Sequence, residues 1–190
     1  MTLYINACVR KNSRTDELAR YVLAQSADTD TQEVNLQNER ILPMDKKMLM
    51  RRDEYIARSD FSDAIFSYAQ QFANADTIII AAPYWDLLFP ASLRAYIERV
   101  CVVGVTFAYT KSGVLHSLCK AQHLIYVTTA GGFIGKRHLG FEYIKAISAQ
   151  FFGISDIRIV KAEGLDIAGA DVRAILERAK SEYQHDEKTF

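Results

Sequence analysis

A short polar loop near the amino terminus carries the residue types best suited to chemistry. The run that starts at Ile5 reads INACVRKNSRTDELARYV, so an apolar segment passes directly into the start of a helix. Basic and hydroxyl side chains lie between the two, and such side chains bind phosphate. A helix amino terminus adds free N–H groups and a partial positive charge. The loop therefore predicts either an anion site or a capped helix beside solvated arginines.

The same loop places a thiol and a guanidinium at a spacing that suits nucleophilic attack on phosphorus. Cys8 and Arg14 stand at C-x5-R spacing, which resembles the nucleophile loop of the low-molecular-weight tyrosine phosphatases. A thiolate beside arginines at a helix amino terminus has a lowered pKa. That family also uses an Asp-Pro segment late in the chain as the acid, and none of the three prolines here follows an aspartate. A hydrolase of this kind is the alternative to phosphate binding.

A second loop is unusually aromatic. It reads PYWDLLFPASL and follows TIIIAAP, the most strand-like segment of the chain. Tyr84, Trp85 and the run Leu87–Phe89 stand where a chain ordinarily turns polar. Such residues can line a pocket for a flat, hydrophobic ligand, or they can pack beneath the next helix or against a second subunit. One loop can serve both purposes.

A third loop, TTAGGFIGKRHLG, brings Gly131 and Gly132 directly after a strand-like run. Adjacent glycines allow a backbone to approach a ligand closely, but they also form ordinary turns. No G-x-G-x-x-G motif follows a strand. Direct binding of NAD in the Rossmann manner is therefore disfavoured.

The elements that must position these loops alternate along the chain. Apolar runs predict strands, and the patterns between them predict helices. The expected strands are Leu3–Val9, Glu33–Leu36, Thr77–Ala82, His123–Thr129 and Ile157–Ala162. The expected helices are Thr15–Ser26, a long stretch ending near Asn74, Ala91–Val103, Gly140–Phe152 and Ala170–Gln184. This order predicts one α/β domain over residues 1–190, with a parallel sheet and helices on both faces. Ligands bind such sheets beyond the carboxyl ends of the strands.

Composition narrows the class of protein. Lysine plus arginine and aspartate plus glutamate number 23 each, so no net charge recruits nucleic acid or an anionic membrane. Three separated cysteines without a C-x-x-C pair indicate reduced thiols, and we expect a cytoplasmic protein. Four scattered histidines lack the spacing of metal ligands. The apolar stretches are shorter than the roughly 20 residues that span a bilayer.

Several segments together resemble one family. The chain is similar to the flavodoxin-like, FMN-dependent NAD(P)H oxidoreductases, which include azoreductases and NAD(P)H:quinone reductases. The matching segments are RKNSRT, PYWDLLFPASLRAYIERV, GVTFAYTKSGV, TTAGG and GISDIRIVKAEGLD. The resemblance implies a flavodoxin-like three-layer sandwich with a five-stranded parallel sheet of strand order 2-1-3-4-5.

The resemblance also implies a cofactor and its ligands. FMN would receive electrons from NADH or NADPH and pass them to a quinone or an azo compound by ping-pong hydride transfer, in a homodimer. The phosphate would lie on Arg10, Ser13, Arg14 and Thr15. The ring would lie along Pro83, Tyr84, Trp85, Asp86 and Leu87, and its other edge would meet Thr129, Ala130, Gly131 and Gly132. No side chain is assigned as a catalytic acid, because backbone N–H groups can stabilise the reduced ring. A non-catalytic FMN electron carrier is a further alternative.

Overall fold

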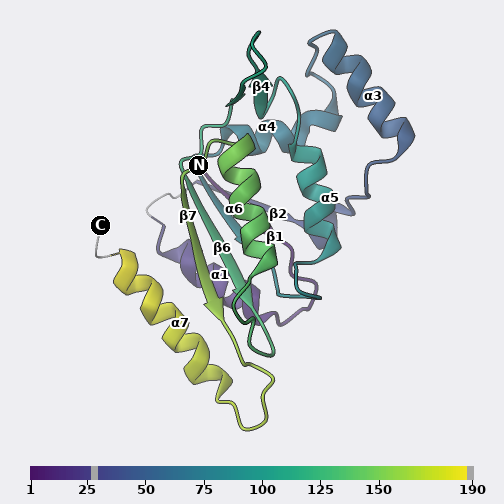
Figure 1. The fold of residues 1–190 in the computed structure, drawn as a ribbon. Coiled ribbons are helices and arrows are strands. Elements are labelled where there is room, and N and C mark those ends of the chain that lie inside the picture. Colours follow the sequence, from purple (N-terminus) through teal and green to yellow (C-terminus); the bar gives the residue numbers. More distant parts are fainter. Residues whose placement is uncertain (27–29, 188–190) are drawn as a thin grey trace.

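The computed structural model describes residues 1–26 and 30–187 and contains a five-stranded parallel sheet (Figure 1). The strands lie in the order β2-β1-β3-β6-β7, which is 2-1-3-4-5 when the sheet's strands are renumbered along the chain. Their bounds are β1 Thr2–Asn6, β2 Thr31–Asn35, β3 Thr77–Ala81, β6 His123–Thr129 and β7 Asp156–Ala162. In register, Ile5 of β1 lies opposite Val34 on one side and Ile80 on the other. The predicted topology is confirmed.

Helices cover both faces of this sheet and give three layers (Figure 1). Their bounds are α1 Arg14–Ala24, α2 Leu36–Glu39, α3 Lys46–Ala57, α4 Ser67–Asn74, α5 Ala91–Val100, α6 Leu139–Phe151 and α7 Val172–Glu187. Helices α1 and α7 pack on one face, and α4, α5 and α6 pack on the other. The three-layer sandwich is therefore confirmed as well.

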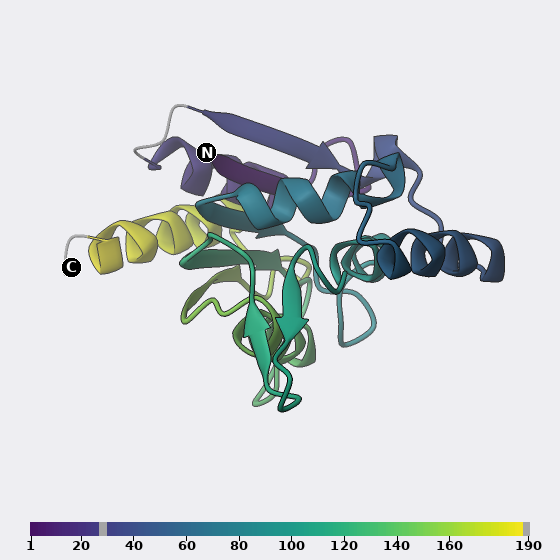
Figure 2. The same ribbon diagram turned by 90° about the horizontal axis from the view of Figure 1, so that it is seen from above.

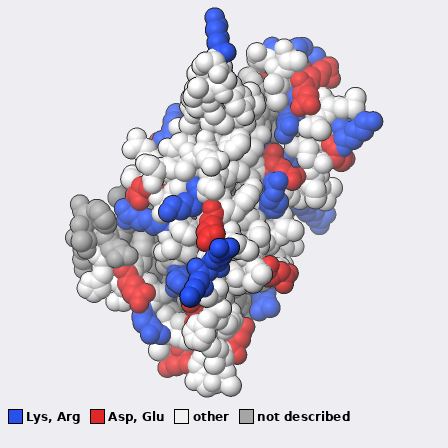
Figure 3. Space-filling view, viewed as in Figure 1, with Lys and Arg blue, Asp and Glu red and all other residues white. Residues whose placement is uncertain are grey.

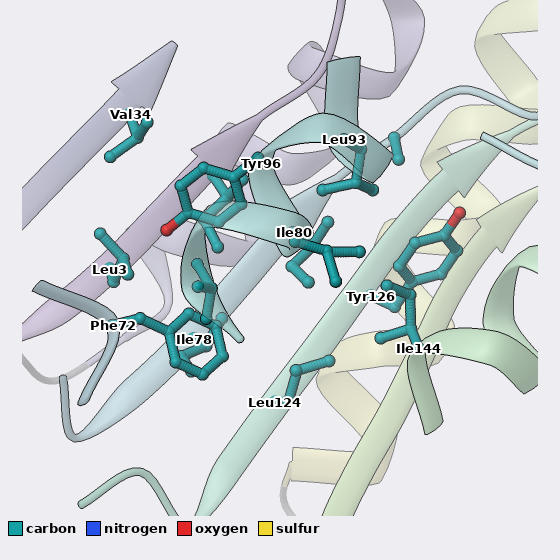
Figure 4. Packing of buried hydrophobic residues seen from close by; sticks show 14 of the residues in the cluster. Leu3, Val34, Phe72, Ile78, Ile80, Leu93, Tyr96, Leu124, Tyr126 and Ile144 are labelled. Atoms are coloured by element: carbon teal, nitrogen blue, oxygen red, sulfur yellow. The ribbon is translucent and has the colours of Figure 1, made fainter. Parts of the chain in front are cut away.

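The core divides between the two faces because successive strand side chains alternate. In β3, Ile78 and Ile80 pack against α4, α5 and α6, as Figure 4 shows with Leu93 and Tyr96. The next residue, Ile79, points to the other face, toward α1 and α7. A fully buried isoleucine contributes about 1.5–3 kcal/mol. The continuous apolar run of β3 thus reflects burial on both sides.

Two regions differ from the sequence prediction. The long stretch that ends at Asn74 is broken into α2, α3, a 3-10 turn over Ala64–Phe66 and α4. Aspartates start two of these pieces: Asp45 accepts from the Met48 N–H at the beginning of α3, and Asp63 accepts from the Ile65 N–H. No residue of α3 is buried, and Figure 2 shows this helix standing to one side of the sheet.

The second difference is a hairpin that begins in the GVTFAYTKSG segment and ends just beyond it, where no strand was predicted. Strands β4 Phe107–Tyr109 and β5 Leu115–Ser117 pair antiparallel outside the main sheet. Each has three residues, too few to establish a period of two in the sequence. The Thr106 hydroxyl anchors the hairpin by donating to the Val100 carbonyl at 2.8 Å.

Candidate functional site

The three loops singled out in the sequence meet at one end of the sheet. They follow β1, β3 and β6, whose carboxyl ends lie together because the strands are parallel. The strand order reverses at β1, which is where ligands bind such sheets. A pocket of about 170 Å³ lies here, and we call it the carboxyl-edge cleft. It is lined by Val9, Arg10, Asn12, Ser13, Arg14, Thr15, Pro83, Tyr84, Trp85, Thr129, Gly131 and Asp166.

Most of the predicted cofactor-binding residues line this cleft. Asp86, Leu87, Ala130 and Gly132 were also predicted, and they lie beside it in the same loops without lining it. Asp166 lines the cleft and was not predicted, although it ends the AEGLD segment that follows β7. Sequence matching indicated that segment, but its role depends on contacts that only the folded chain makes.

The first loop forms a capped helix start. Ser13 is the N-cap of α1, and its hydroxyl oxygen accepts from the Asp16 N–H at 3.3 Å. The first N–H groups of any helix lack intrahelical partners, so the amides of Arg14 and Thr15 suit an anion. Capping and anion binding are therefore compatible at this position. Arg10 is exposed at the rim.

The Asp16 carboxylate in this first turn accepts hydrogen bonds from three donors. The Tyr4 hydroxyl donates to it at 2.6 Å, the Asn6 side-chain amide at 2.8 Å and the Arg20 Nε at 3.0 Å. Burial and the bond to Asp16 raise the pKa of Tyr4, which keeps its phenol as a donor. This network fixes the start of α1 against β1.

Arg14 does not extend freely into solvent. Its Nη2 donates to the Asp166 carboxylate at 2.7 Å, and its Nη1 donates to the Leu165 carbonyl at 3.0 Å. Both acceptors belong to the segment after β7. The predicted phosphate-binding arginine is thus attached to a fourth loop.

The aromatic loop makes a tight turn. Asp86 and Leu87 have φ values of 50° and 69°, and Trp85 and Leu88 exchange backbone hydrogen bonds across them. Left-handed backbone at both central positions is typical of a type I′ turn and costs a side-chain-bearing residue about 1–2 kcal/mol. The turn leaves the Leu87 side chain 62% exposed and Trp85 37% exposed.

Some residues of the aromatic loop line the pocket, whereas others pack beneath a helix. Phe89 is buried and its ring lies 5.7 Å from that of Tyr143 in α6, so it packs beneath a helix. Tyr84 and Trp85 line the cleft instead. The Tyr84 N–H donates to the Thr129 carbonyl at 3.0 Å, which ties the aromatic loop to the loop after β6.

The two glycines of the loop after β6 differ in the space around them. A β-carbon at position 131 would overlap the Asp166 carboxylate, and the Asp166 N–H donates to the Gly131 carbonyl at 2.9 Å. A β-carbon at Gly132 would meet open space. Gly131 therefore accommodates another protein segment, an alternative that the sequence did not indicate.

His138 lies behind Tyr84 and starts α6. Its Nδ1 accepts from the Phe141 N–H at 3.0 Å, so the neutral ring carries its hydrogen on Nε2. Burial lowers the pKa of His138, and its ring lies 5.3 Å from Tyr84 and 5.7 Å from Tyr126. This histidine serves as a helix cap within an aromatic cluster.

The environment of Cys8 opposes nucleophilic catalysis. The side chain is buried, and burial raises the pKa of the thiol to about 11. A phosphatase nucleophile needs the opposite shift, toward a thiolate at neutral pH. The lowered pKa inferred from the nearby arginines is wrong, because desolvation has the larger effect here.

Three further properties concern the described residues as a whole. Among residues 1–26 and 30–187, no three histidine, cysteine, aspartate or glutamate side chains cluster as a metal site would require. Nor does any helix in those ranges combine the length and the apolar character needed to cross a membrane. Lysine and arginine alternate with aspartate and glutamate over the face seen in Figure 3.

Comparison with known proteins gives consistent matches. A family model described as the flavodoxin-like fold matches residues 1–186. The FMN-dependent NADH:quinone oxidoreductase of Clostridium beijerinckii is 32% identical over 203 aligned positions, which cover 99% of this chain and 98% of that protein. The FMN-dependent NADH:quinone oxidoreductase 2 of Clostridium acetobutylicum is 38% identical over 131 positions, which cover 66% of this chain and 64% of that protein.

Solved structures share the fold. The FMN-dependent NADH-azoreductase of Bacillus anthracis, solved in complex with FMN, superimposes with a TM-score of 0.80 at 22% identity, covering 99% of this chain and 97% of that one. An NAD(P)H:quinone oxidoreductase from Methanothermobacter marburgensis has a TM-score of 0.70 at 17% identity and covers 95% and 96% of the two chains.

Proposed function

Because the chain belongs to the flavodoxin-like family whose model matches residues 1–186, we propose that it is an FMN-dependent NAD(P)H oxidoreductase. Its acceptors are quinones, azo compounds or similar molecules, reduced by ping-pong hydride transfer within one domain of residues 1–190. One observation carries the proposal: a helix amino terminus, an aromatic turn and a glycine loop line the same cleft at the strand-order reversal. The names of the Clostridium relatives support FMN and a quinone.

The cleft residues fit the phosphate end of FMN. The amino terminus of α1 offers N–H groups and the positive end of its dipole. The Ser13 oxygen accepts from Asp16, which leaves its hydrogen for a phosphate oxygen. Arg10 and Arg14 add positive charge, and both line the cleft. Thr15 is buried below them and supports the loop through Thr129.

The other walls fit a flat ring. Pro83, Tyr84 and Trp85 present apolar and aromatic surface, and Thr129 and Gly131 line the cleft beside them. The bound FMN supplies the chemistry of accepting and donating a hydride. The protein's part is to orient the ring, to exclude water with the aromatic wall and to offer backbone N–H groups to developing negative charge. No side chain is required as a proton donor.

A homodimer is part of the proposal. The turn at Asp86 and Leu87 exposes Leu87 and Leu88 beside the cleft, and exposed apolar side chains at a ligand site are commonly covered by a second subunit. We propose that the protein acts in the cytoplasm, in keeping with its unpaired cysteines.

The test begins with the absorption spectrum of the purified full chain and identification of the released chromophore. We expect a flavin spectrum, release of FMN, and steady oxidation of NADH or NADPH when a quinone is added. Protein that takes up no FMN from a saturating solution would refute the proposal. Bound FMN without turnover of any acceptor would support the electron carrier instead. Release of phosphate from an aryl phosphate, abolished by Cys8→Ser, would support the hydrolase.

A further inference from the structure

The segment after β7 is attached to the carboxyl-edge cleft at several points. The backbone N–H groups of Gly164, Leu165 and Asp166 donate to the carbonyls of Gly132, Ala130 and Gly131 respectively. These bonds run side by side along the glycine loop. The position of Asp166 is therefore set by its backbone as well as by its side chain.

The Asp166 side chain has two distinct neighbours. Its Oδ1 accepts from Arg14 Nη2 at 2.7 Å, while its Oδ2 lies over Gly131, where any β-carbon would collide with it. The Leu165 carbonyl accepts from Arg14 Nη1 at 3.0 Å. Two adjacent acceptors thus hold one guanidinium at two nitrogens.

The ion pair between Arg14 and Asp166 contributes little to the stability of the fold. The Arg14 side chain is 29% exposed and that of Asp166 is 63% exposed, and ion pairs this open contribute little to folding. The effect of the pair on the position of the Arg14 guanidinium is larger than its effect on stability. An arginine held at two nitrogens loses less conformational freedom when it binds an anion, and its remaining N–H groups are available to do so.

A carboxylate beside a phosphate site also has an opposing electrostatic effect. Asp166 lines the cleft, so its negative charge repels an anionic ligand if nothing compensates. Here Arg14 neutralises it at hydrogen-bonding distance. The two effects predict opposite results when the Asp166 charge is removed, which makes them separable.

We propose that Asp166 is a positioning residue for the cofactor: together with the Leu165 carbonyl, it holds Arg14 so that the guanidinium meets the phosphate of FMN. This inference rests on the proposed function. It assigns a role to the segment after β7, and it accounts for the close approach of the Asp166 carboxylate to Gly131, where an added β-carbon would force that side chain to shift.

The experiment compares two ligands that differ only in the phosphate. The full chain is stripped of cofactor and titrated with FMN and with riboflavin, as wild type, Asp166→Asn and Asp166→Ala. The matched control is Glu163→Gln, which removes one negative charge from the same segment, where Glu163 pairs with Lys161 outside the cleft. Thermal unfolding checks that each variant folds.

We expect both Asp166 variants to bind FMN about tenfold more weakly, as the loss of one charge-assisted contact predicts, with riboflavin affinity unchanged. Glu163→Gln should match wild type for both ligands. In an Arg14→Ala background, Asp166→Ala should no longer weaken FMN binding and should instead leave it unchanged or strengthen it, because the uncompensated negative charge is removed.

Three results would overturn the inference: tighter FMN binding in Asp166→Asn, equal losses for FMN and riboflavin, or wild-type FMN affinity in both variants. The first would identify Asp166 as a repulsive charge, and the second would make it a general support of the loops. A wild-type chain that binds neither ligand would instead refute the proposed function, so the two failures are distinguishable.

Discussion

The hydroxyls of Thr15 and Thr129 lie 2.6 Å apart beneath the carboxyl-edge cleft and join the loop after β1 to the end of β6. Both residues are buried, so each hydroxyl depends on the other. Replacing Thr15 by valine keeps the shape but leaves the Thr129 hydroxyl without this partner. We expect a loss of about 1–3 kcal/mol in the free energy of unfolding, measured with urea.

The double variant Thr15→Val/Thr129→Val is the informative comparison, since it removes both polar groups. It should be closer to wild type than either single variant. Ser112→Ala is the control, because it removes one hydroxyl of an exposed pair with Thr110. Additive losses in the double variant would contradict the mutual dependence of the two hydroxyls.

If Arg14 binds the FMN phosphate as we propose, Arg14→Ala should weaken FMN binding about tenfold or more, because a charge-assisted contact is lost. Titration of the stripped protein measures this effect. Arg58→Ala is the matched control: it removes one positive charge just past the end of α3 and one exposed ion pair with Glu54. Unchanged FMN affinity in Arg14→Ala would remove this residue from the phosphate site.

Leu87→Gly should raise the free energy of unfolding by about 1 kcal/mol, because glycine adopts the φ of 69° at this position without a steric cost. Thermal or urea unfolding tests this. Leu88→Gly serves as the control, since Leu88 has no left-handed backbone. Destabilisation by Leu87→Gly at low protein concentration would show that the Leu87 side chain contributes more than its exposure implies.

Cys8 should resist alkylation in the folded protein near neutral pH, since burial raises its pKa to about 11. Deprotonation favours the unfolded state, in which the thiol has an ordinary pKa. The stabilising effect of the protonated thiol is therefore present below about pH 9 and is lost as the pH rises toward 11. Mass spectrometry after iodoacetamide treatment, with and without denaturant, measures the protection. Rapid labelling of native Cys8 at pH 7 would contradict it.

The sequence predicted the sheet well because its central strands are continuous apolar runs. TIIIA is buried on both faces, and few other structures accept such a run. The hairpin at Phe107 and the helices between Leu36 and Asn74 were harder to predict. Short strands have no clear period, and α3 buries no residue, so its sequence lacks a strong apolar stripe.

The site was predictable to the extent that it follows from strand direction. Loops after parallel strands must meet at one edge, so residues as distant as Ser13, Trp85 and Gly131 could be grouped in advance. Asp166 could not be found this way. Its partners are a guanidinium and a glycine far away in the sequence, and neither local pattern nor composition indicates such contacts.

The exposure of helix α3 affects which part of the molecule unfolds locally first. Its Tyr55 and Ile56 pack beside Phe66, Met48 accepts from Arg99 and Arg51 pairs with Asp63, but the helix buries no side chain completely. Its amide protons will exchange with solvent long before those of β1 and β3, through a fluctuation that leaves the sheet intact. We therefore expect the carboxyl-edge cleft to keep its form when the polypeptide is cut or lengthened at this helix.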